Sequence, residues 1–146
     1  MLVIGIGNSY RNDDGVGPAV LALLRTMQLP GVRLLECDGD CSALLAAWQG
    51  ADAVVLVDAV SSSASPGTIY RFDLLAQELP RDLSFHSTHA FGVAEALALG
   101  RVLEQLPASL TLYGIEGKSF ATGTGLSGEV SSALQEVAWQ LERDLA

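Results

Sequence analysis

Short apolar runs alternate with longer segments of helical composition along most of the chain. A run that is apolar at every position is typical of a strand buried on both faces of a sheet. A longer segment of helix formers between glycine, proline, serine or threonine is typical of a helix. The predicted strands are residues 1–4, 32–37, 53–57, 67–72 and 110–115. The predicted helices are residues 18–26, 42–49 and 90–106, with a last helix that starts at residue 127.

The order of these elements predicts the fold class. Strands that alternate with helices form a parallel sheet with helices on both faces. We therefore expect an α/β fold, a three-layer α/β/α sandwich with a mostly parallel twisted sheet of about five strands. The run at 53–57 is nearly all β-branched, which favours the centre of the sheet, whereas the segment 67–72 favours an edge. A chain of 146 residues suits a single domain, residues 1–146.

The most informative polar segment follows the first strand. Residues 5–17 contain four glycines together with Asn8 and the adjacent pair Asp13 and Asp14. Glycine permits backbone shapes that other residues resist, so the segment predicts a loop that presents polar groups. A dinucleotide-binding loop would need glycine at position 10, where this chain has Tyr10. One aspartate can serve as a helix cap, but two in succession suggest a further role.

Two more chemical groups are expected at the same edge of the sheet. Asp58 directly follows the central strand, and parallel strands of an open sheet bind ligands beyond their carboxyl ends. His89 directly precedes a predicted helix, where the helix dipole favours a neutral imidazole. With Asp14 these residues could hold a divalent cation or act as acid and base. The alternative is structural: Asp58 caps a turn, one histidine caps the helix, and the other packs on the surface.

Composition limits the partners. Eight basic and seventeen acidic residues give a net charge of -9, which disfavours nucleic acid and anionic membrane surfaces. Apolar runs stay shorter than a membrane span, and no cationic region precedes the first one, so we expect a cytoplasmic protein. Cys37 and Cys41 are too few for a disulfide framework and are expected to be reduced packing residues. The glycine-rich loop 116–126 could close over the site.

Four motifs carry a resemblance to a known family. They are G-I-G-N-x-x-R-x-D-D-G-V-G at 5–17, V-D-A-V at 57–60, S-T-H-A-F-G at 87–92 and Y-G-I-E-G at 113–117. In this order and over essentially the whole chain, they resemble the hydrogenase maturation endopeptidases. The last motif is similar to that of members serving cytoplasmic, bidirectional-type hydrogenases.

The resemblance implies an activity and a site. Such proteases remove a C-terminal extension from the precursor of a nickel–iron hydrogenase large subunit after nickel insertion, and they are classed with aspartic-type peptidases. The implied metal-binding and catalytic residues are Asp14, Asp58 and His89, with nickel supplied by the substrate rather than held tightly by the free protein. Some relatives have glutamate where this chain has Asp14.

The resemblance also implies a mode of recognition and an oligomeric state. Asp38, with Gly39 and Asn8, is expected to help recognise the precursor, and the protein is expected to act as a monomer. Two other functions remain open: a nickel-sensing binding module that uses the same residues to dock on the precursor without cutting it, and a small-molecule hydrolase on the same fold. The sequence assigns no role to His86.

Overall fold

The computed structural model describes residues 1–80, 84–85 and 92–145, with residues 84–85 described as backbone only. The strands are β1 Leu2–Ile6, β2 Arg33–Cys37, β3 Ala53–Ser61, β4 Ile69–Asp73, β5 Ser84–Phe85 and β6 Ser109–Glu116. The helices are α1 Val16–Met27, α2 Cys41–Trp48, α3 Val93–Val102 and α4 Gly128–Leu145, and a 3-10 helix, η1, covers Asn12–Gly15.

The strands form one mostly parallel sheet. Its order is β2-β1-β3-β6-β4, in which β1, β2, β3 and β6 are parallel and β4 is antiparallel to β6. The central position of β3 and the edge position of β4 are as the sequence predicts. The short strand β5, which pairs with the end of β3, was not predicted, because two residues carry no periodic signal.

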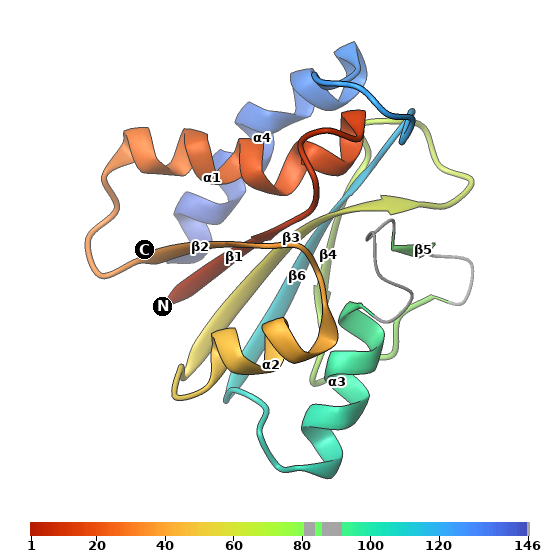
Figure 1. The fold of residues 1–146 in the computed structure, drawn as a ribbon. Helices are drawn as coiled ribbons and strands as arrows, with labels where there is room; N and C mark the ends of the chain where they lie inside the picture. Colours follow the sequence, from red (N-terminus) through yellow and green to blue (C-terminus); the bar gives the residue numbers. More distant parts are fainter. Residues whose placement is uncertain (81–83, 86–91, 146) are drawn as a thin grey trace.

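Helices cover both faces of the sheet, which confirms the three-layer sandwich. Helices α1 and α4 lie on one face, and α2 and α3 lie on the other (Figure 1). Each face has its own apolar core. One core joins α1 and α4 to the sheet through buried residues such as Val20, Leu21 and Val137. The other joins α2 and α3 to the opposite face through residues such as Leu44 and Trp48.

Helix α3 ends earlier than predicted, at a turn that the sequence does not signal. It begins at Val93 and ends at Val102. Two residues after its end, Glu104 adopts a left-handed conformation with φ +56. The N–H of Glu104 donates to Arg101 O at 3.3 Å, and the N–H of Gln105 donates to Gly100 O at 2.8 Å. These bonds form a Schellman motif, in which glycine usually takes the left-handed position. Glutamate gives no such signal in the sequence.

No helix within the described ranges is long and apolar enough to cross a membrane.

Candidate active site

The loop after β1 buries Asp14. Gly7 turns the chain with φ +142, and η1 then places Asp14 inside the protein at 1% exposure. The Oδ2 atom of Asp14 accepts a hydrogen bond from the backbone N–H of Asn8 at 3.0 Å, but its buried Oδ1 has no partner in residues 1–80 or 92–145. Burial raises the pKa of Asp14, and the Asn8 bond and the charge of Arg11 offset only part of this effect.

Asp58 lies inside β3 rather than after it. The predicted strand ends at residue 57, but β3 continues to Ser61, and Asp58 has no exposed surface. A turn-capping role for Asp58 is therefore wrong. Its Oδ1 accepts the backbone N–H of Ala59 at 2.8 Å, and its Oδ2 is buried without a partner in the described segments. Burial raises the pKa of Asp58 well above its usual value, and the charge of Asp14 raises it further.

The structure brings the two predicted carboxylates into electrostatic contact in a buried setting. Each has one oxygen that no group of the described residues satisfies, and such oxygens are rare because an unpaired buried polar atom is unfavourable. Two oxygens of this kind suit a cation that would neutralise both charges. The described part of the chain holds no group of three potential metal ligands. His86 and His89 both lie outside the described residues.

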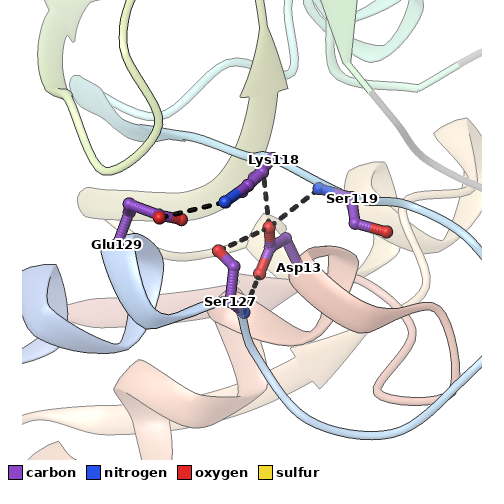
Figure 2. Close-up of polar contacts among 5 residues, drawn as sticks. All are labelled: Asp13, Lys118, Ser119, Ser127 and Glu129. Carbon is purple, nitrogen blue, oxygen red and sulfur yellow. Dashed lines mark hydrogen bonds and ion pairs between the residues drawn. The ribbon is translucent and has the colours of Figure 1, made fainter.

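Asp13 has a different role from its neighbour. Its carboxylate is fully buried and accepts four hydrogen bonds from the segment that follows β6 (Figure 2). The donors are the N–H groups of Lys118 at 2.7 Å, Ser119 at 3.0 Å and Ser127 at 2.7 Å, and the Ser127 hydroxyl at 2.9 Å. Burial alone would raise the pKa of Asp13, but these bonds outweigh it and hold the pKa below its usual value. Asp13 is thus an anchor for the later loop.

Backbone bonds complete this anchorage. Asn12 N–H donates to Gly123 O at 3.0 Å, Asp13 N–H donates to Ser119 O at 2.9 Å, and Gly123 N–H donates to Tyr10 O at 2.8 Å. The loop that was expected to close over the site is therefore bound to the first loop along much of its length. The prediction that this loop could close over the site did not include these bonds. They join residues that are far apart in the sequence, so no local pattern indicates them.

Two of the residues expected to recognise a substrate, Asn8 and Asp38, line an open groove of about 430 Å³, and Asn8 links this groove to Asp14. The groove is lined by Gly7, Asn8, Ser9, Tyr10, Pro18, Glu36, Cys37 and Asp38. Asp38 is exposed, and its Oδ1 accepts the backbone N–H of Asp40 at 3.1 Å. Gly39 is buried with φ +93, so it shapes the turn rather than presenting a group.

Both cysteines are free, in agreement with the prediction that they are not bridged. Cys41, the first residue of α2, is buried in the core, and Cys37 is half-buried. Burial raises the pKa of both thiols, which disfavours the reactive thiolate.

Sequence reasoning missed the site of one further buried acid, Glu116 at the end of β6. It is 2% exposed, and its carboxylate accepts the N–H of Ser62 at 2.7 Å, the Ser62 hydroxyl at 2.6 Å and the Tyr70 hydroxyl at 3.2 Å. These bonds tie the turn after β3 to the end of β6. The available signal is a charged residue at the end of an apolar strand, and Glu116 is this residue in the motif at 113–117.

Comparison with known proteins agrees with this architecture. A family model described as hydrogenase maturation protease matches residues 19–143. A putative hydrogenase maturation protease of Methanocaldococcus jannaschii is 30% identical over 142 residues, which cover 93% of this chain and 90% of the relative. The hydrogenase expression/formation protein HupD of Thiocapsa roseopersicina is 37% identical over 120 residues, which cover 80% of this chain but only 53% of that relative. The structure of the [NiFe] hydrogenase maturation protease HybD from Thermococcus kodakarensis has the same fold, with a TM-score of 0.79, 24% identity, and coverage of 99% of this chain and 98% of that one.

Proposed function

The chain belongs to the hydrogenase maturation protease family, and on that premise we propose that it is an endopeptidase acting on a nickel–iron hydrogenase large-subunit precursor. The proposed reaction removes the C-terminal extension of the precursor after nickel insertion. The protein would act as a cytoplasmic monomer.

One observation carries the proposal: among the residues that the structure describes, Asp14 and Asp58 each keep a buried oxygen without a hydrogen-bond partner. A fold that needed these acids only for structure would satisfy them, as it satisfies Asp13 and Glu116. The repulsion between the two carboxylates would be relieved by a divalent cation. In this proposal the cation is the nickel of the precursor, which is part of the substrate.

Each residue then has a role. Asp14 and Asp58 would each give one oxygen to nickel, and His89 would give a ring nitrogen, since both ligand types suit this ion. The role of His89 rests on the sequence motif at 87–92. The bound ion supplies a Lewis acid beside the scissile bond. The protein's own part is to position the bond and to accept a proton from the attacking water at a carboxylate, which makes it an aspartic-type peptidase.

Recognition of the rest of the precursor would fall to the groove beside Asp14. Asn8 links the two features directly, because it lines the groove and its N–H donates to Asp14. Asp38 would contact the precursor from its place in the groove lining, and Gly39 would hold the turn that presents Asp38.

The test is mass spectrometry of a nickel-loaded large-subunit precursor incubated with the protein. We expect loss of one defined C-terminal peptide with the unmodified protein, and no loss with Asp14→Asn, Asp58→Asn or His89→Ala. Glu142→Gln, at an exposed position of α4, is the matched control and should cut normally. Binding without shortening would establish the binding module instead. If the protein neither binds nor cuts the precursor, the endopeptidase and the binding module are both overturned. The small-molecule hydrolase would then be tested with ester and phosphoester substrates.

A further inference from the structure

The outer edge of β2 is an open sheet edge next to the candidate site. Within the described ranges, β2 pairs only with β1. Arg33 N–H donates to Met1 O at 3.0 Å, and Cys37 O accepts the N–H of Gly7 at 3.0 Å. Backbone groups of a parallel strand alternate in direction, so residues 33, 35 and 37 face β1. The N–H and C=O groups of Leu34 and Glu36 therefore face outward.

A line of depressions follows this edge toward Asp14. At the start of β2 lies a pocket of about 210 Å³, lined by Leu24, Arg25, Gln28, Leu29, Val32 and Leu34. At the other end, Glu36 and Pro18 line both the 430 Å³ groove beside Asn8 and an adjoining pocket of about 340 Å³ over α1. Leu34 and Glu36 are two residues apart and share one face of the strand.

The chemistry changes along this line. The pocket at Leu34 is mainly aliphatic, with Leu24, Leu29 and Val32 beside it. The charged residues that line the two depressions at the other end are Glu36 and Asp38, both acidic. An occupant that follows the edge would therefore place an apolar side chain at Leu34 and a cationic side chain at Glu36.

We infer that an extended segment of the precursor, near its cleavage point, adds to the outer edge of β2 as a further strand. This inference rests on the proposed function and names how the same site holds its substrate. The main-chain groups of Leu34 and Glu36 provide the hydrogen bonds, and the two side-chain environments select an aliphatic and a basic residue two positions apart. The exposed edge, which would otherwise invite unspecific pairing, has a partner in this arrangement.

The distance between the edge of β2 and Asp58 limits how close to the scissile bond the bound segment can lie. Neighbouring strands lie about 4.8 Å apart, so a strand added outside β2 lies three spacings, or about 14 Å, from β3 and Asp58. An extended chain advances about 3.3 Å per residue. At least about four residues must therefore separate the residues that pair with β2 from the scissile bond.

Amide hydrogen exchange tests the pairing directly. In the free protein the amides of Leu34 and Glu36 should exchange fast, whereas those of Leu35 and Cys37 should be protected by β1. Adding the nickel-loaded precursor to the cleavage-inactive Asp58→Asn protein should slow exchange at Leu34 and Glu36 at least tenfold. No change at these amides in a saturated complex, or protection only along β4, would overturn the inference.

Kinetics give a second test with matched variants. Glu36→Gln removes the charge and keeps the N–H, whereas Glu36→Pro also removes the outward N–H without a loss to the β1 ladder. We expect the KM for the precursor to rise several-fold in the first and more than tenfold in the second, with kcat and melting temperature nearly unchanged. If the KM is unchanged in both variants and the unmodified protein cleaves the precursor, strand addition at β2 is overturned and the proposed function is kept. No cleavage by the unmodified protein would instead overturn the proposed function.

Discussion

Asp14 and Asp58 form a buried acid pair in which the charge of the first raises the pKa of the second. Within the described part of the chain, each carboxylate accepts its hydrogen bond from a backbone N–H rather than from a cationic side chain, and each keeps one unsatisfied oxygen. The pair is therefore a source of instability in the free protein, as expected of groups held for function rather than for folding.

Asp58→Asn should stabilise the protein and abolish precursor processing. Because the pKa of Asp58 is raised in the folded state, its ionised form destabilises the fold at neutral pH, and an amide removes that charge at nearly the same size. We expect the free energy of unfolding at pH 7 to increase by about 0.5–2 kcal/mol. Urea unfolding measures it. A variant that is both less stable and inactive would show that Asp58 has a structural role.

Asp13→Ala should destabilise the protein strongly. It leaves the N–H groups of Lys118, Ser119 and Ser127 without their acceptor, with an expected loss of about 2–4 kcal/mol. Ser127→Ala removes only the hydroxyl donor and should lose about 1 kcal/mol. The two variants can be compared by urea unfolding. Equal losses would mean that the loop does not depend on the Asp13 carboxylate.

Gly7→Ala should disrupt the site, whereas Gly31→Ala should not. A Cβ at Gly7 would overlap the backbone oxygen of Asp14, and its φ of +142 disfavours any other residue. Gly31 also has a positive φ, +72, but has no heavy atom within 4 Å of an added Cβ. We expect losses of about 3 kcal/mol and about 1 kcal/mol, measured by thermal or urea unfolding. Similar losses would indicate that the first loop can move away from Asp14.

Tyr113 should make the fold sensitive to alkali. Burial and a hydrogen bond to Asp144 raise the pKa of Tyr113 to about 12, above the ordinary value of 10.0. The protonated phenol therefore stabilises the fold fully below pH 10, and this contribution is lost as the pH rises through about 12. Its complete loss corresponds to about 3 kcal/mol.

Tyr113→Phe tests this dependence. The variant should lose about 1 kcal/mol at pH 8, because the hydrogen bond to Asp144 is gone, but its stability should fall less between pH 8 and pH 11 than that of the unmodified protein. Urea unfolding at both pH values measures the difference. Parallel decreases in the two proteins would assign the alkaline sensitivity to other groups.

The sequence predicts the sheet well because its signals are local. The β-branched run that becomes β3 identifies the central strand, and the polar segment after β1 identifies the loop that holds Asp14. Asp58 was found for the same reason, although its strand continues three residues further. A continuous run broken by one acid gives no sign that the strand resumes beyond it.

Other features depend on contacts between distant residues and could not be predicted. Two adjacent aspartates look alike in sequence, yet Asp13 is fully hydrogen-bonded and Asp14 is not, because the donors to Asp13 come from the loop after β6. The partners of Glu116 are 46 and 54 residues away in the chain. The pattern of apolar and polar positions carries no information about hydrogen bonds between residues so far apart in the sequence.

The anchorage of Asp13 also sets when the site can be completed during synthesis. Its hydrogen-bond donors lie 105 to 114 residues after it. A growing chain therefore contains both Asp14 and Asp58 long before the segment that fixes the first loop has left the ribosome. The two acids would reach their final arrangement only once Ser127 has emerged and docked, so a partly made chain would have the acids without the assembled site.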